Sequence, residues 1–161
     1  MNKWNQDWHS FKQLLRRYLK ENKPKKILEW GPGESTNIII NICPNSNIIS
    51  IEHNEKWYNI AKEEFKEYNN IKIIYKEINK NTKYATKGYD NSPYDFIFID
   101  GRRRVECAII ALQTIKKDGV IMLHDSNRTN YTKPLNPYID KIEEKDDTLV
   151  FKPNEKNIIY N

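Results

Sequence analysis

The chain has 161 residues, of which 38% are hydrophobic and 30% are charged, and it carries a net charge of +5. This length suits one domain, so we assign residues 1–161 to a single domain. No run of about 18 apolar residues is present, which excludes a membrane-spanning segment. The first ten residues also lack the apolar centre of a signal peptide, so we expect a cytoplasmic protein with reduced cysteines.

The basic balance of the chain permits anionic partners, including nucleic acid. The lysines are scattered among glutamates and asparagines, however, and the densest basic segments are KPKK at residues 23–26 and RRR at residues 102–104. We therefore interpret most of the positive charge as a solvated surface.

The first half of the chain alternates between helical and strand patterns. Residues 4–20 place apolar side chains at three- and four-residue steps, which predicts an amphipathic helix within residues 1–22. We expect this helix to cover the functional site. A buried strand is predicted at 26–30 and another at 47–52. Helices are predicted at 34–41 and 54–68, the latter capped by Asn54 and packing Trp57 into the core.

The second half continues the alternation. Strands are predicted at 71–77, 94–100 and 119–124, with a polar loop at 79–93 and a helix at 103–117. The predicted inward side chains of that helix are Val105, Ala108, Ile109, Leu112 and Ile115.

The end of the chain reads as an antiparallel hairpin of residues 138–143 and 148–152. Strands that alternate with helices indicate an α/β fold, in which helices cover both faces of a mostly parallel, doubly wound sheet.

The segment ILEWGPGESTNII, residues 27–39, places a glycine turn between a strand and a helix. A dinucleotide site needs a third glycine where this chain has Thr36. Glu29 before the turn would repel a pyrophosphate but attract an ammonium group. Gly31 and Gly33 allow close approach of the backbone, and Glu52 ends the next strand where it can accept ribose hydroxyls. S-adenosylmethionine has this combination of groups and no phosphate.

At these residues the chain resembles the class I S-adenosylmethionine-dependent methyltransferases. The resemblance rests on EWGPGES, SIEHNEKWY, YDFIFIDGR and GVIMLHDSNR, and covers nearly the whole chain. It implies a Rossmann-like, seven-stranded sheet whose last strand is antiparallel. Ser35 stands where many members have glycine. The predicted cofactor-binding residues are Glu29, Gly31, Gly33, Ser35, Glu52, His53 and Asp100. The alternative is that the two glutamates are ordinary polar strand ends.

Asp100, His124 and Asp125 end two neighbouring strands and are the predicted catalytic residues. Methyl transfer to a hydroxyl requires removal of its proton. His124 or Asp125 can accept that proton, or a divalent cation such as Mg²⁺, held by Asp100, Asp125 and Asn127, can lower the hydroxyl pKa. The sequence does not offer the full ligand pattern of the metal-dependent sugar and catechol O-methyltransferases that it resembles.

Three arginines, Arg102–Arg104, begin a predicted helix, where the helix dipole disfavours cations. An acidic neighbour or an anionic substrate would compensate them, or they point into solvent. Arg128 and Tyr131 follow the next strand. The predicted substrate-binding residues are Arg102, Arg104, Arg128 and Tyr131.

The function predicted from these residues is O-methylation of a small molecule or glycan. A nucleic-acid methyltransferase is one alternative, although NSPY at residues 91–94 precedes its strand and reads as a turn, not as a base-holding motif. A non-catalytic module that binds S-adenosylmethionine is the other. The sequence does not indicate an oligomeric contact.

Overall fold

We describe the protein from a computed structural model that defines residues 10–79 and 83–155. The beginning of the predicted first helix, with Trp4 and Trp8, lies outside these residues. No helix in the described ranges has the length and apolar composition needed to cross a membrane.

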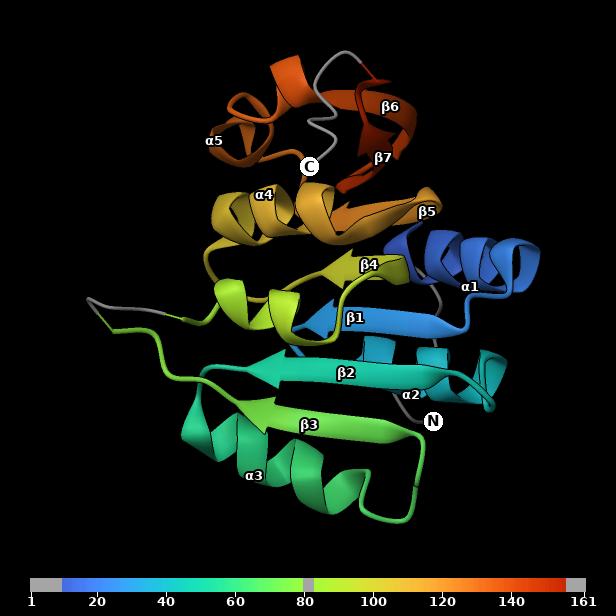
Figure 1. Cartoon of the computed structure of the whole chain (residues 1–161), viewed down its shortest axis with the longest axis vertical. Helices are drawn as coiled ribbons and strands as arrows, with labels where there is room; N and C mark the ends of the chain where they lie inside the picture. Colours follow the sequence, from blue (N-terminus) through green and yellow to red (C-terminus); the bar gives the residue numbers. More distant parts are fainter. Residues whose placement is uncertain (1–9, 80–82, 156–161) are drawn as a thin grey trace, which may run out of the picture.

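Seven strands form one sheet in the order β3-β2-β1-β4-β5-β7-β6, from bottom to top in Figure 1. Neighbours from β3 to β5 pair in parallel, whereas β7 pairs antiparallel with both β5 and β6. The predicted mostly parallel sheet with an antiparallel last strand is confirmed. The strands are β1 (Lys26–Trp30), β2 (Asn47–Glu52), β3 (Ile71–Tyr75), β4 (Tyr94–Ile99), β5 (Ile115–His124), β6 (Ile139–Lys145) and β7 (Thr148–Pro153).

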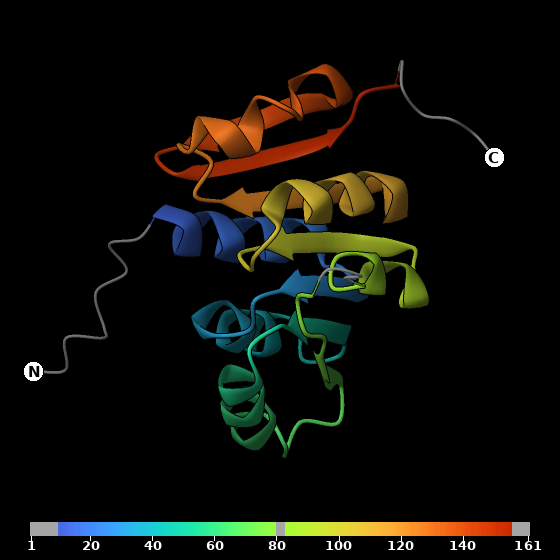
Figure 2. The same ribbon diagram turned by 90° about the vertical axis from the view of Figure 1, so that its left-hand side faces the viewer.

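Helices cover both faces of the sheet (Figures 1 and 2). The first three helices of the chain pack on one face of the sheet, against the side chains of Phe96 and Phe98, and the fourth helix packs on the other face, against Ile97 and Ile99. These neighbouring residues of β4 face opposite sides because side chains alternate along a strand. The helices are α1 (Ser10–Asn22), α2 (Glu34–Ile42), α3 (Glu55–Glu64), α4 (Arg104–Thr114) and the short α5 (Thr129–Thr132); the 3₁₀ helices are η1 (Thr86–Asn91) and η2 (Asn136–Tyr138).

Several predicted boundaries were wrong. The helix predicted at 103–117 ends at Thr114, and Ile115 already pairs with Tyr94 in the sheet. Ile109 is 45% exposed instead of inward, since the buried stripe of α4 runs through Cys107, Ala108, Ile110 and Ala111. The apolar residues at 105, 109, 112 and 115 fitted a helical period equally well, and only contact with the sheet selects the stripe.

The loop predicted to be polar, residues 79–93, carries part of the second core. Tyr84 and Ala85 are buried, and η1 packs on Trp30 so closely that a Cβ on Gly88 would lie 2.6 Å from Cζ2 of that ring. The described part of this loop therefore supports α4 and the sheet.

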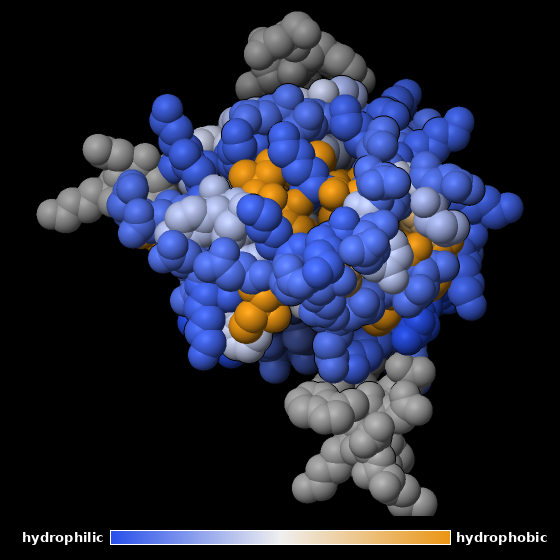
Figure 3. Space-filling view, turned by 90° about the horizontal axis from the view of Figure 1, so that it is seen from below, coloured by the Kyte–Doolittle hydropathy of each residue, from blue (hydrophilic) through white to orange (hydrophobic). Residues whose placement is uncertain are grey.

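The edge of the molecule formed by β3 and α3 shows only small apolar areas between polar side chains (Figure 3). Ile60 on α3 is 42% exposed and Tyr75 at the end of β3 is 37% exposed. Such scattered apolar side chains are normal on a protein surface.

Candidate functional site

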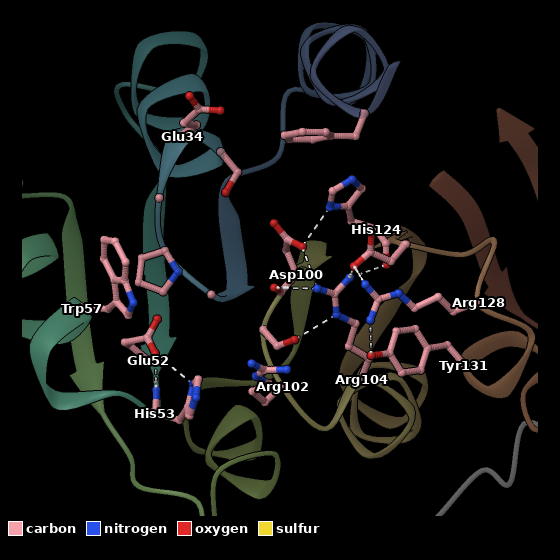
Figure 4. Close-up of a pocket in the computed structure, with 17 residues that line it drawn as sticks. Glu34, Glu52, His53, Trp57, Asp100, Arg102, Arg104, His124, Arg128 and Tyr131 are labelled. Carbon is pink, nitrogen blue, oxygen red and sulfur yellow. Dashed lines mark hydrogen bonds and ion pairs between the residues drawn. The ribbon is translucent and has the colours of Figure 1, made fainter. Parts of the chain in front are cut away.

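A cavity of about 590 Å³ lies at the carboxyl ends of β1, β2, β4 and β5. Its walls come from the segments that follow these four strands and from Phe11 on α1 (Figure 4). The strand order reverses between β1 and β4, which is where open α/β sheets bind their ligands. The volume lies within the range of about 300–1,000 Å³ that small-molecule pockets occupy.

The turn after β1 forms the floor of this cavity. Gly31 has a φ of +89°, and a Cβ there would lie 2.8 Å from the amide nitrogen of Gly101. Gly31 is therefore required by the close approach of the two turns. A Cβ on Gly33 would meet no atom within 4 Å, so at Gly33 the backbone faces open space. A ligand can thus approach the start of α2 closely at this position.

Glu29 does not face the cavity. Its side chain is fully buried beneath the turn, where the hydroxyl groups of Ser35, Thr36 and Ser50 donate hydrogen bonds to its carboxylate. Burial raises the pKa of Glu29 from 4.5 to about 7, although these three hydrogen bonds lower it. The predicted contact between Glu29 and a cofactor is thus corrected: Glu29 braces the turn from below. Ser35 lines the cavity and connects it to this buried carboxylate.

Glu52 does lie at the wall of the cavity, on the side of β2. Its Oε1 accepts hydrogen bonds of 2.8 Å from the backbone amides of His53 and Asn54. The imidazole Nδ1 of His53 also lies 2.9 Å from this oxygen, close enough for an ion pair but without the angle of a hydrogen bond. The contacts within the described residues thus use one oxygen of Glu52 and leave Oε2 for a ligand.

His53 and Trp57 extend the same side of the cavity. The ring of His53 meets Tyr84 edge-on at a centroid distance of 5.7 Å, which fixes its orientation. Trp57 is 58% exposed, so the prediction that it packs in the core was wrong. Its place near the start of α3 turns it to the mouth of the cavity (Figure 4).

On the opposite side, three predicted catalytic residues come together. Ligand-type atoms of Asp100, His124 and Asp125 lie within 4.8 Å of one another. His124 is held between two carboxylates: Nδ1 lies 2.9 Å from Oδ1 of Asp100, and Nε2 lies 3.2 Å from Oδ2 of Asp147. Burial alone would lower the pKa of His124, but the hydrogen bond to Asp100 and the nearby carboxylates raise it above 6.5. Both ring nitrogens are therefore engaged, and the charged imidazolium is favoured.

Asp147 was missed by the sequence analysis, because it belongs to the turn between β6 and β7. The antiparallel pairing of β7 with β5, which sets Thr148 opposite His124, brings Asp147 to this histidine. No local pattern in the sequence predicts such a contact.

Arg104 lies at the centre of the same cluster. Its guanidinium pairs with Oδ1 of Asp100 at 3.0 Å and with Oδ2 of Asp125 at 2.9 Å. It also donates hydrogen bonds to the backbone carbonyls of Gly101, His124 and Asp100. Acidic neighbours thus compensate this arginine at the start of α4, which is one of the two outcomes that the sequence allowed. The same contacts make Arg104 a structural part of the wall instead of a free substrate ligand.

The remaining predicted acceptor residues lie around this cluster. Arg102, Arg128 and Tyr131 all line the cavity. The guanidinium of Arg104 lies 5.5 Å from the centroid of the Tyr131 ring, and the guanidinium of Arg128 lies 5.8 Å from the same centroid, so both can make cation–π contacts. The predicted metal ligand Asn127 is exposed and is not among the residues that line the cavity.

Helix α1 closes the cavity above His124. The ring of Phe11 lies 4.4 Å from the imidazole of His124, centroid to centroid. Nζ of Lys12 lies 2.8 Å from Oε2 of Glu34, which ties α1 to the first turn of α2. The described part of loop 79–93 contributes no residue to the cavity wall.

The comparison with protein families gives one match, to a family described as a methyltransferase domain, over residues 28–126. This range contains the glycine turn and the ends of β2, β4 and β5. The chain belongs to this methyltransferase family.

The fold of this methyltransferase domain recurs in solved structures. A methyltransferase from Podospora anserina, bound to S-adenosylhomocysteine, is 17% identical with a TM-score of 0.73, over 90% of this chain and 78% of that one. A putative caffeoyl-CoA O-methyltransferase from Staphylococcus aureus is 22% identical with a TM-score of 0.68, over 89% and 82%. An O-methyltransferase from Bacillus cereus, in complex with S-adenosylhomocysteine, is 16% identical with a TM-score of 0.71, over 91% and 82%. A search of curated proteins returned no match.

Proposed function

We propose that this methyltransferase transfers the methyl group of S-adenosylmethionine to a hydroxyl of a small molecule or glycan. The observation that carries the proposal is one cavity lined by the glycine turn, by Glu52 and by the cluster of Asp100, His124 and Asp125. Glu52 and His124 lie on opposite sides of it (Figure 4). Two of the similar structures are described as O-methyltransferases, and two contain S-adenosylhomocysteine.

The turn side of the cavity fits this cofactor better than a dinucleotide. Gly33 leaves open space for the amino-acid end, and Oε2 of Glu52 is available to ribose hydroxyls. The turn also has Thr36 where a dinucleotide site needs a third glycine. We assign Gly31, Gly33, Ser35, Glu52, His53 and Asp100 to cofactor binding.

The acceptor side supplies carboxylates for proton removal. When bound, S-adenosylmethionine supplies an electrophilic methyl group on a sulfonium. We assign the role of general base to Asp125: the contacts of this residue within the described chain use Oδ2, which leaves Oδ1 to accept the hydroxyl proton. His124 contacts Asp100 through Nδ1 and Asp147 through Nε2, so neither ring nitrogen is free to accept a proton. We therefore assign it the role of a positioning residue.

Two arginines favour an acceptor that carries negative charge. Arg128 is exposed, its Nη2 lies 3.8 Å from Asp125, and its Nη1 lies 3.5 Å from the hydroxyl of Tyr131. These are weak contacts, so Arg128 can turn to a ligand, and Arg102 lines the same cavity. We therefore assign Arg102, Arg128 and Tyr131 to acceptor binding.

The test begins with calorimetric titration of the protein with S-adenosylmethionine and with NAD. We expect binding of the former only. Labelled S-adenosylmethionine is then used to screen hydroxylated acceptors in pairs with and without a carboxylate or phosphate.

With an acceptor in hand, Asp125→Asn should lower kcat by about 10²–10⁴ with an unchanged cofactor dissociation constant. Asp118→Asn, at the far end of β5, is the matched control. Arg128→Ala should raise KM for a charged acceptor more than for its neutral partner. Comparable NAD binding, or full activity of Asp125→Asn, would refute the assignment.

A further inference from the structure

The guanidinium of Arg104 makes three hydrogen bonds and two ion pairs. Nε donates to the carbonyl of Gly101 at 2.9 Å; Nη1 donates to the carbonyl of His124 at 2.6 Å and pairs with Asp125; Nη2 donates to the carbonyl of Asp100 at 3.1 Å and pairs with its carboxylate. Three of these contacts are hydrogen bonds to backbone carbonyls, and the other two are ion pairs with carboxylates. The side chain is only 11% exposed, so solvent does not compete for these contacts.

This arrangement places a fixed positive charge between the two carboxylates that the sequence analysis assigned to Mg²⁺. The guanidinium nitrogens lie 3.0 Å from Oδ1 of Asp100 and 2.9 Å from Oδ2 of Asp125. A divalent cation on the same oxygens would have to displace Arg104 or stand beside it, and like charges at such a distance repel strongly in a partly buried site. His124 adds a second obstacle, because its Nδ1 already binds Oδ1 of Asp100. The described residues therefore do not fit a divalent cation.

We propose that Arg104 is the resident cation of this site, and that it makes the acceptor side of the cavity independent of a divalent metal. The guanidinium joins the ends of β4 and β5 and fixes Asp100 and Asp125 in the cavity wall. It also compensates their charge, which a metal would otherwise do. The inference deepens the proposed function, since it specifies how the same site prepares an acceptor hydroxyl.

The decisive measurement is binding of Mn²⁺, followed by the electron paramagnetic resonance signal of the free ion, and it needs no acceptor. Three variants are compared with the wild-type protein. Arg104→Met removes the charge and keeps an unbranched side chain, Arg104→Lys keeps the charge without the planar fork, and Arg103→Met is the matched control. Arg103 is exposed and pairs with Glu106 within the first turn of α4. Cofactor titration and thermal unfolding of each variant report whether it is folded.

We expect no saturable Mn²⁺ binding to the wild-type protein, to Arg103→Met or to Arg104→Lys. Arg104→Met should bind Mn²⁺ at least about 100-fold more tightly than the wild type, since a repelling charge is gone and Asp100 and Asp125 lose their ion pairs with it. The further change Asp125→Asn in that background should abolish the gain. If Arg104→Met is unfolded, the wild-type titration and Arg104→Lys still decide the question.

Saturable Mn²⁺ binding to the wild-type protein that Asp125→Asn removes would overturn the proposal. So would a folded Arg104→Met variant that gains no Mn²⁺ affinity, because Arg104 would then not be what excludes the metal. Once an acceptor is known, wild-type turnover should survive EDTA. Failure to bind S-adenosylmethionine would instead refute the proposed function and leave the Mn²⁺ result standing.

Discussion

The buried carboxyl group of Glu29 predicts an unusual dependence of stability on pH. Its pKa rises from 4.5 to about 7 on folding, mainly because burial disfavours the charged form. Between these two values the native protein holds a proton that the unfolded chain has released. The unfolding free energy must therefore fall as the pH rises through this window, and it becomes flat again above the folded pKa.

The magnitude follows from the size of the shift. A difference of roughly 2.5 pKa units corresponds to about 3 kcal/mol of unfolding free energy, lost between pH 4.5 and about 7. Glu29→Gln removes the titration but keeps a carbonyl that can accept the hydrogen bond from Ser35, and its amide nitrogen can donate to the hydroxyls of Thr36 and Ser50, which share the other oxygen of Glu29. We expect the difference in stability between the wild type and this variant to change by about 3 kcal/mol across the window.

The assay is urea denaturation at several pH values, with the unfolding free energy extrapolated to water for each protein. Glu63→Gln is the matched control, since the side chain of Glu63 is 74% exposed. Its stability should follow the wild type at every pH. If wild type and Glu29→Gln show parallel pH profiles, Glu29 titrates normally and the argument from burial fails.

Three further predictions use the same protein. Glu52→Ala should weaken S-adenosylmethionine binding by about 1–3 kcal/mol in calorimetry, because ribose hydroxyls lose a charged acceptor, and unchanged affinity would remove Glu52 from the cofactor site. Gly31→Ala should lower the unfolding free energy by at least about 1–3 kcal/mol, whereas Gly33→Ala should not, since only Gly31 has a positive φ and a crowded Cβ position. The stability advantage of wild type over His124→Gln should be complete below pH 6.5 and decline as the pH rises through the raised folded pKa; a constant advantage would contradict the pairing with two carboxylates.

The sequence by itself determined the alternation of strands and helices and the place of the cofactor turn. Apolar periodicity and the glycine turn are local signals that need no knowledge of distant contacts. The carboxyl ends of parallel strands meet at one edge of a sheet, so the order of residues along the chain was enough to assign Glu52, Asp100 and Asp125 to a common cavity.

Only the tertiary structure decided which of these side chains face the cavity and what they contact. Glu29 is two positions before Gly31, which lines the cavity, yet it points beneath the turn, where Ser50 on the neighbouring strand and two hydroxyls of α2 enclose it. Arg104 was predicted to be a substrate ligand, but three backbone carbonyls and two carboxylates at the ends of β4 and β5 already contact it. Asp147 reaches His124 through the pairing of β5 and β7. Such contacts depend on which strands are neighbours and on side-chain direction, and neither is encoded in a local pattern of residues.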